Sequence, residues 1–293
     1  PSRQAMWNAV KDIDELKGVF SVSYRSASEL LISGTEKSLL SSSGARQGTT
    51  DGPPIFALTL QPALNNLNAL PGIVALAYLD DVTMMADSWD AAEPAARDFL
   101  AECAANGLFP NMKKCEVFPA ESTNTSTDTT KYHILSQFKV ATSGVIKLLG
   151  ASIGRNNESE EKHLFDREAE KTVVFFRRLV RRAGPQMFTV LRVCGVPKLQ
   201  HAVRVHDPSV TARLAQLFDS RVEAVMQTWA YAKPFGTRQR LILSLPRSMG
   251  GMGLTRMELI APAAYRASEG PALRQDRRIA SQAKLANLVY CGV

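Results

Sequence analysis

Two adjacent acidic residues, Asp80 and Asp81, lie between two short apolar segments, and this pattern constrains the fold more than any other feature. Residues 73–79 and 82–86 have the composition and length of two buried strands of a hairpin. No lysine or arginine occurs in residues 47–96, so no neighbour along the chain neutralises the acids. Because burying an unpaired carboxylate is costly, the pair must lie at a wet turn or bind a cation. Alternatively, Asp-Asp is simply a two-residue hairpin turn, and the dipeptide alone does not decide between these interpretations.

Helical spacing surrounds the predicted hairpin in the first half of the chain. Residues 4–19 show the pattern of an amphipathic helix, and residues 20–32 alternate as extended chain would. Residues 44–54 are rich in Gly, Thr and Pro and predict a loop, which leads into a helix over 55–70. A further helix is predicted over 91–105 and ends at an Asn-Gly pair. The first half therefore mixes helices and strands.

The second half is predicted to be mainly helical. Residues 122–130 form a Ser/Thr/Asn/Asp tract with almost nothing to bury, which indicates an exposed insertion. Short strands are predicted at 134–140 and 145–149. Residues 162–229 then read as a three-helix unit, interrupted at Gly184-Pro185 and again at residues 206–208.

Charge is unevenly distributed along the chain, whose formal net charge is +7. Residues 1–160 hold 13 Lys and Arg against 18 Asp and Glu, a net −5, whereas residues 161–293 hold 22 against 10, a net +12. A basic helical half suits binding to a polyanion, and the alternative is an ordinary solvated helix face. The basic residues concerned are Arg177, Arg178, Arg181, Arg182, Arg192, Lys198, Arg204 and Arg213.

Composition excludes several other classes of protein. No run of 18 or more apolar residues occurs, so the sequence predicts no membrane-spanning helix. The four cysteines and four histidines lack the spacing of a zinc site. We therefore interpret the cysteines as reduced intracellular thiols.

Four motifs in a fixed order now point to a family. Tyr78-Leu79-Asp80-Asp81 is the Tyr-X-Asp-Asp form of the reverse transcriptase palm motif. Residues 44–48, Gly-Ala-Arg-Gln-Gly, followed by Pro54-Ile55-Phe56, resemble the motif that precedes it. Residues 107–115 resemble the Gly-Leu…Asn…Lys motif that follows it, and Leu148-Leu149-Gly150 is similar to the primer-grip turn. The combination is far more specific than any one motif.

The chain most resembles the reverse transcriptases of non-LTR retrotransposons. One departure is residues 48–53, Gly-Thr-Thr-Asp-Gly-Pro, where the family usually has Gly-Asp-Pro-Leu-Gly-Pro. The resemblance implies an α+β fold, in which a polymerase palm with an incomplete antiparallel sheet precedes an all-helical thumb and a helical tail. Residues 1–160 would form partial fingers and palm, 161–230 the thumb, and 231–293 the post-thumb helical segment.

The resemblance also implies two-metal nucleotidyl transfer with two Mg²⁺ ions, for which Mn²⁺ is an alternative. Asp80 is expected to be the direct metal ligand and Asp81 its partner, so both are the predicted catalytic residues. Tyr78 would flank the primer terminus. An RNA template, a DNA primer and deoxynucleoside triphosphates are the expected partners, in a nuclear or cytoplasmic ribonucleoprotein and without a membrane.

Further contacts are expected from the neighbouring motifs. Arg46, Gln47 and Gly48 would contact the nucleotide or template, although Arg46 also fits a solvated loop cation. Lys114 would meet the triphosphate, with Lys113 as its rival. The primer grip would be formed by Leu149 and Gly150, for which a mere strand end is the alternative.

The third carboxylate of the family comes from a strand just before a segment whose last part resembles Ser2-Arg3. We therefore expect this chain to be inactive alone and to require an upstream fingers and palm segment of the same polyprotein. An alternative of another class is a domesticated, non-catalytic RNA-binding or scaffold protein derived from a reverse transcriptase. A viral RNA-dependent RNA polymerase fits less well, because such enzymes usually have Gly where Leu79 stands.

Overall fold

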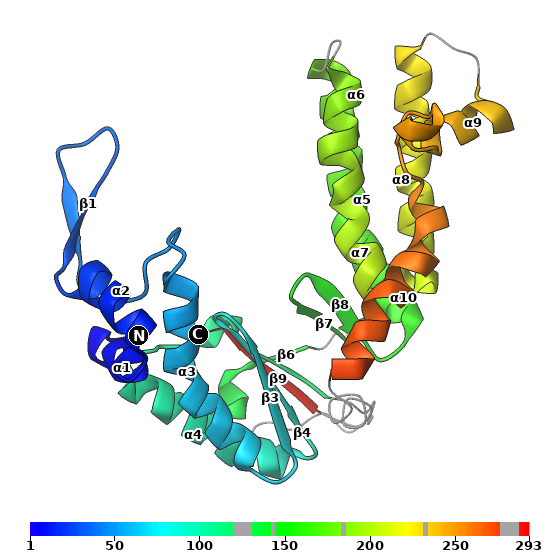
Figure 1. Cartoon of the computed structure of the whole chain (residues 1–293). Coiled ribbons are helices and arrows are strands. Elements are labelled where there is room, and N and C mark those ends of the chain that lie inside the picture. The colour runs from blue at the N-terminus through cyan, green and yellow to red at the C-terminus, as the bar shows by residue number, and fades with distance from the viewer. Residues whose placement is uncertain (120–130, 142–143, 183–185, 231–233, 276–286, 293) are drawn as a thin grey trace. The chain divides into compact units, whose positions relative to one another are not determined.

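The structure is a computed structural model that describes residues 1–119, 131–141, 144–182, 186–230, 234–275 and 287–292. The chain forms two compact units (Figure 1). The first comprises Pro1–Ala141 together with Gln282–Val293, and the second comprises Thr142–Ser281. The first unit holds the sheet with the acidic pair, and the second is mostly helical. The predicted α+β class is confirmed.

The first unit begins with helices whose ends are set by local sequence. Ser2 caps the first helix, because its Oγ accepts the Ala5 N–H at 3.1 Å. Ser88 caps the fourth helix in the same way through the Ala91 N–H, at 3.2 Å. A small hairpin of two strands separates the second and third helices. The elements are α1 (Arg3–Val10), α2 (Asp14–Tyr24), β1 (Ser28–Leu31), β2 (Ser38–Ser41), α3 (Gly52–Ala69) and α4 (Trp89–Ala105).

Extended chain was predicted from residue 20, but α2 continues to Tyr24. Phe20 and Tyr24 lie one helical turn apart, and both are buried, with 6% and 2% of their surface exposed. Their rings stack with centroids 5.2 Å apart. Because a helix places residues four apart on one face, packing favours the helix over the strand that the β-branched neighbours suggested.

The central sheet of the first unit has five strands in the order β3-β4-β9-β5-β6. Neighbouring strands are antiparallel except for the parallel pair β5 and β6. The inner position beside β4 is taken by β9, drawn in red in Figure 1, so the predicted helical tail ends in a strand. The strands are β3 (Ile73–Tyr78), β4 (Asp81–Ala86), β5 (Glu116–Phe118), β6 (Lys139–Val140) and β9 (Asn287–Gly292).

Helix α3 holds the edge strand β3 through the amide of Asn68. Its Oδ1 accepts the Ala75 N–H at 2.8 Å, and its Nδ2 donates to the Ala75 carbonyl at 3.0 Å. The side chain thus bonds the strand as a neighbouring strand would. Leu60, Phe99 and other buried side chains fill the core between the sheet and the helices α3 and α4. The hairpin tip is therefore carried on a well-packed base.

The segment before β6 differs from the predicted strand over 134–140. A short 3₁₀ turn (Leu135–Gln137) precedes β6 (Lys139–Val140). The carboxylate of Glu93 accepts the N–H groups of Ile134 at 2.8 Å and Leu135 at 3.0 Å. These bonds satisfy the backbone donors of a turn at this point. The predicted insertion at 122–130 lies outside the described residues.

The second unit starts with a two-stranded hairpin and continues with helices. Helices α5 and α8 pack along each other (Figure 1). The core of the second unit includes Phe176, Leu191, Leu214 and Phe218. The predicted break at 206–208 is confirmed, whereas the predicted break at Gly184-Pro185 lies outside the described residues. The elements are β7 (Val145–Leu148), β8 (Ala151–Gly154), α5 (Asn157–Arg182), α6 (Met187–Val190), α7 (Gln200–Val205), α8 (Pro208–Trp229), α9 (Thr237–Ser244) and α10 (Met257–Gln275).

Asp219 on α8 anchors the start of α10. Its carboxylate accepts the N–H groups of Met257 at 2.9 Å and Glu258 at 3.1 Å, which belong to the first turn of α10. Burial raises the pKa of Asp219, and these two bonds oppose that rise. A carboxylate from another helix thus caps α10.

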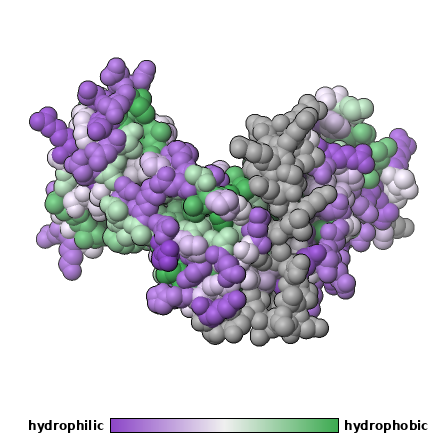
Figure 2. All heavy atoms as spheres, turned by 90° about the horizontal axis from the view of Figure 1, so that it is seen from below, coloured by the Kyte–Doolittle hydropathy of each residue, from purple (hydrophilic) through white to green (hydrophobic). Residues whose placement is uncertain are grey.

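In the described part of the chain, every helix is too short or too polar to span a bilayer. On the left-hand side of the face drawn in Figure 2, hydrophobic residues form patches that hydrophilic residues separate.

Candidate active site

The acidic pair lies at the tip of the β3–β4 hairpin. Tyr78 pairs with Asp81, so Leu79 and Asp80 are the two residues of the turn. Leu79 has φ +56°, and a positive φ at the first turn residue alone is the pattern of a type II′ turn. Asp80 is exposed and Asp81, the first residue of β4, is half-buried. The acids are therefore not both turn residues, because one belongs to the turn and the other to the strand.

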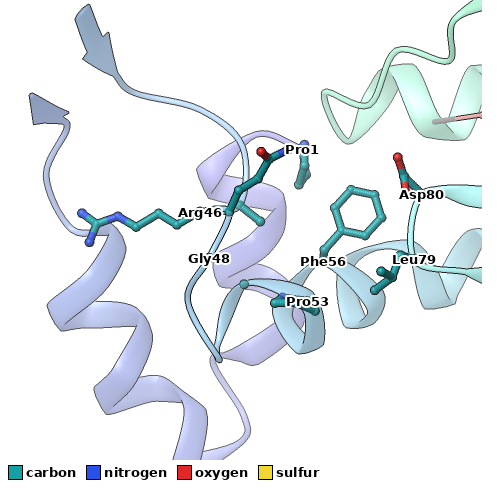
Figure 3. Close-up of a pocket in the computed structure, with 10 residues that line it drawn as sticks. Pro1, Arg46, Gly48, Pro53, Phe56, Leu79 and Asp80 are labelled. Carbon is teal, nitrogen blue, oxygen red and sulfur yellow. The ribbon is translucent and has the colours of Figure 1, made fainter. Parts of the chain in front are cut away.

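Asp80 lines a pocket of about 410 Å³. Residues 45–48 of the 44–48 loop line this pocket as well, together with Gly52, Pro53 and Phe56 at the start of α3. In Figure 3 the Phe56 ring lies between Asp80 and the loop that carries Arg46. The fold thus joins two motifs that lie more than thirty residues apart in the sequence.

The side chain of Arg46 points away from Asp80 (Figure 3). Its guanidinium donates to Ser28 Oγ and lies over the Tyr24 ring, 5.7 Å from the ring centroid. Its backbone N–H donates to the Tyr24 hydroxyl at 3.1 Å. The side chain therefore lines a second cavity, at the base of the β1–β2 hairpin, whereas residue 46 also borders the Asp80 pocket.

Gln47 and Gly48 both line the Asp80 pocket. Gly48 has φ +85°, a left-handed conformation that favours glycine, and the space where a Cβ would stand is open. Gly52 is needed for a different reason, because a Cβ there would lie 2.2 Å from the Arg46 carbonyl oxygen. This close approach joins the loop to α3.

Several residues of this site were missed by sequence reasoning. Tyr24 is 22 residues from the loop that its hydroxyl supports, and no local pattern links the two. Gly52, Pro53 and Phe56 were noted as part of the segment that resembles the family motif, but no role in a pocket was predicted for them. The local signal in the sequence was the Gly52-Pro53 pair ahead of the helical segment, because such a pair indicates a tight turn into the first turn of a helix.

The remaining predicted residues of the first unit lie outside the lining of this pocket. Tyr78 ends β3 and is 64% exposed, directly opposite Asp81 in the hairpin. Lys113 and Lys114 occupy a short 3₁₀ turn (Met112–Lys114), and both are exposed.

Leu149 and Gly150 belong to the second unit and form the turn between β7 and β8. Their φ angles are +46° and +86°, the pattern of a type I′ hairpin turn. Leu149 is 49% exposed. These residues therefore form the two-residue turn of the β7–β8 hairpin.

The donor set at the hairpin tip suits a hard divalent cation but is small. Asp80 and Asp81 supply adjacent carboxylates, the ligands that Mg²⁺ prefers. Within the described ranges, no group of three or more His, Cys, Asp or Glu side chains is placed to hold a metal ion. The two adjacent carboxylates therefore fit the chemistry of a divalent-cation site.

Replacing Leu79 by glycine should stabilise the first unit. A leucine at positive φ carries strain of about 1–3 kcal/mol, which glycine relieves, while glycine loses about 0.5–1 kcal/mol through the entropy of the unfolded chain. We expect Leu79→Gly to raise the free energy of unfolding by roughly 1 kcal/mol, measured by urea denaturation. An equal or lower stability would contradict the strained turn.

Comparison with known proteins agrees with this geometry. The family model described as reverse transcriptase (RNA-dependent DNA polymerase) matches residues 10–151. That range includes the hairpin tip, the 44–48 loop, both lysines of the 3₁₀ turn and the Leu149-Gly150 turn. Members of this family generally use divalent metal ions, nucleic-acid templates and primers, and nucleotide substrates.

A curated relative extends the match into the helical unit. The chain is 29% identical over 240 residues to the retrotransposable element SLACS 132 kDa protein of Trypanosoma brucei gambiense. The alignment covers 81% of this chain and 19% of that protein, so the chain spans about a fifth of its relative. Together with the Tyr-X-Asp-Asp hairpin and its pocket, these matches show that residues 10–151 belong to the reverse transcriptase family.

Proposed function

We propose that this chain is the palm and thumb portion of an RNA-directed DNA polymerase of a non-LTR retroelement. The observation that carries the proposal is the position of Asp80, at the tip of a hairpin and on the rim of the pocket bordered by the 44–48 loop. The similarity to a retrotransposable element protein supports the retroelement origin.

The proposed reaction joins a nucleotide to a DNA primer on an RNA template. The primer 3′-hydroxyl oxygen attacks the α-phosphorus of a deoxynucleoside triphosphate and loses its proton, and the bond to pyrophosphate breaks. Asp80 and Asp81 would hold divalent ions, and these ions would stabilise the negative charge on the attacking and leaving oxygens. The protein's own contribution is placement of the reacting groups.

The pocket residues are proposed to position the incoming nucleotide and the template base. Gly48 presents backbone without a side chain, so a base can approach closely. Phe56 offers an apolar surface beside Asp80. Residue 46 is proposed to contact the nucleotide or template through its backbone, because its guanidinium is engaged by Ser28 and Tyr24.

Other contacts are proposed for residues around the pocket and in the second unit. Tyr78 would flank the primer terminus, since it lies opposite Asp81 and is exposed. Lys114, or its rival Lys113, would meet the triphosphate. The Leu149-Gly150 turn would contact the primer.

The basic half is proposed to bind the nucleic-acid backbone. Arg177, Arg178 and Arg181 on α5 are exposed, as a phosphate-binding face requires. We expect affinity for an RNA/DNA primer–template to fall by at least about tenfold between 50 and 200 mM salt, because phosphate contacts release counterions. Fluorescence anisotropy across that salt range measures this fall, and a flat response would exclude the phosphate contacts.

Primer extension tests the proposal in a protein that includes the upstream segment expected to carry the third carboxylate. With an RNA template, a DNA primer, deoxynucleoside triphosphates and Mg²⁺, we expect extension that ceases without the metal. The chain of residues 1–293 by itself is expected to bind the primer–template without extending it. Tight binding without extension by the longer protein would instead support a non-catalytic RNA-binding or scaffold protein.

A further inference from the structure

The β7–β8 hairpin of the second unit is held by side chains along one edge of β8. This sheet has two strands, so the outer edge of β8 has no neighbouring strand. Ser152 and Gly154 lie two residues apart, and alternate residues of a strand direct their backbone groups to the same edge. Side chains from α5 and from residue 206, just after α7, bond this edge and the turn beside it, and they take the place of a third strand.

Arg167 of α5 bonds the turn itself. Its Nη2 donates to the Gly150 carbonyl at 2.7 Å, and its Nε donates to Glu168 at 2.7 Å. The side chain is 18% exposed, so most of its length is packed. Gly150 also lies against His201 of α7, because a Cβ on Gly150 would be 3.3 Å from His201 Cε1. The turn is thereby placed against two helices.

His206, just after α7, bonds the next position of β8. Its Nε2 accepts the Ser152 N–H at 2.8 Å, and its Nδ1 lies 3.0 Å from the Ala202 carbonyl oxygen. The ring is 3% exposed. Since Nε2 must accept and the carbonyl can only accept, the partners require the neutral tautomer with the proton on Nδ1.

Two further contacts complete the anchoring. His163 Nδ1 lies 2.9 Å from the Ser152 hydroxyl oxygen. Glu160 accepts the Gly154 N–H at 2.8 Å through Oε1. Backbone groups at 150, 152 and 154 are thus each bonded to a side chain from the helical part of the same unit.

We infer that Arg167 and His206 are positioning residues that fix the Leu149–Gly150 turn to the helices and so determine where the turn holds the primer. The inference rests on the proposed function, since the primer contact of the turn is part of it. Neither residue is among the matched palm and nucleotide motifs, and neither needs to touch nucleic acid. Both act through the backbone of β8.

Acid should loosen this anchoring through His206. The groups that face its ring are the Ser152 N–H on β8, the Ala202 carbonyl and His201 on α7, and Arg167 on α5. Burial lowers the pKa of His206, the hydrogen bond to the Ala202 carbonyl opposes this shift, and the nearby Arg167 and His201 lower the pKa further. The stabilisation by neutral His206 is therefore complete above the unfolded-state pKa of about 6.5 and is lost as pH falls through the lower folded-state pKa.

Three proteins test the inference in the full chain: wild type, His206→Ala and His206→Gln. Glutamine keeps one acceptor and one donor but does not titrate. At pH 7.5 we expect His206→Ala to increase hydrogen exchange of the Ser152 amide about tenfold and to weaken RNA/DNA primer–template binding to a similar extent. At pH 7.5, His206→Gln should keep wild-type binding and the wild-type protection factor of the Ser152 amide, which is exchange corrected for its intrinsic pH dependence. Both should stay constant down to pH 5.5, where the wild type weakens.

The outcomes separate the anchoring from the proposed function. Unchanged Ser152 exchange in His206→Ala would overturn the anchoring. Faster exchange with unchanged primer–template binding would overturn the link to the primer, while the proposed polymerase activity is tested separately at Asp80. If circular dichroism shows that His206→Ala does not fold, Arg167→Lys replaces it as the test. This change keeps the positive charge but loses the paired donors of the guanidinium. It must then give faster exchange of the Ser152 amide and weaker primer–template binding.

Discussion

Asp80→Asn is expected to reduce RNA-templated primer extension by roughly a thousandfold, the effect of removing several kcal/mol of charge stabilisation at a metal-dependent reaction centre. Asparagine has nearly the same shape as aspartate, so the turn should persist while the negative charge is lost. Asp80 is exposed at the tip and lines the pocket, so the change removes little packing. Steady-state extension by the longer protein measures the effect.

Asp87→Asn is the matched control for this experiment. Asp87 is an exposed acid directly after the other end of β4, away from the hairpin tip. We expect its replacement to leave extension within about twofold of wild type, since the substitution alters the net charge equally but not at the reaction centre. Equal losses in the two variants would show that net charge, rather than a metal site at Asp80, explains the result.

Gly52→Ala should destabilise the first unit by roughly 3 kcal/mol, because the new methyl group would overlap backbone that cannot move independently. Its Cβ would lie 2.2 Å from the Arg46 carbonyl oxygen and 3.3 Å from Thr49 Oγ1. Relief of the overlap would push the 44–48 loop away from α3 and distort the pocket. Urea denaturation measures the loss of stability, and hydrogen exchange of residues 44–52 locates the distortion.

Gly18→Ala provides a control of opposite sign. Gly18 lies within α2, and no atom stands within 4 Å of the site of its Cβ. Alanine there should raise the free energy of unfolding by about 1 kcal/mol, the usual gain over glycine inside a helix. Similar destabilisation by both changes would mean that the contact with Arg46 is not the cause.

Local sequence was sufficient wherever the stabilising contacts are close along the chain. The apolar segments around Asp80 and Asp81 predicted the hairpin, because strand periodicity and turn position are set within a few residues. The helix over 91–105 was predicted closely, since α4 spans Trp89–Ala105 and has its cap and its stop in adjacent residues. The ordered motifs also predicted the family that the comparison then matched.

Distant contacts decided the features that were missed. The strand β9 lies beside β4 although some two hundred residues separate them, and no periodicity in either segment encodes that pairing. Helix α2 extends to Tyr24 because that ring packs on Phe20 and supports the backbone of Arg46. In each case the partner lies too far along the chain for a local pattern to record it.

The sequence by itself therefore determined the hairpin, the helix over 91–105, the acidic tip and the family, because these depend on the order of side chains along short stretches. The tertiary structure decided which stretches meet. Folding brings Asp80 to the pocket lined by Gly48 and Phe56, and it brings the Gly150 turn into contact with Arg167. Both contacts join segments that lie far apart along the chain, so local sequence does not encode them.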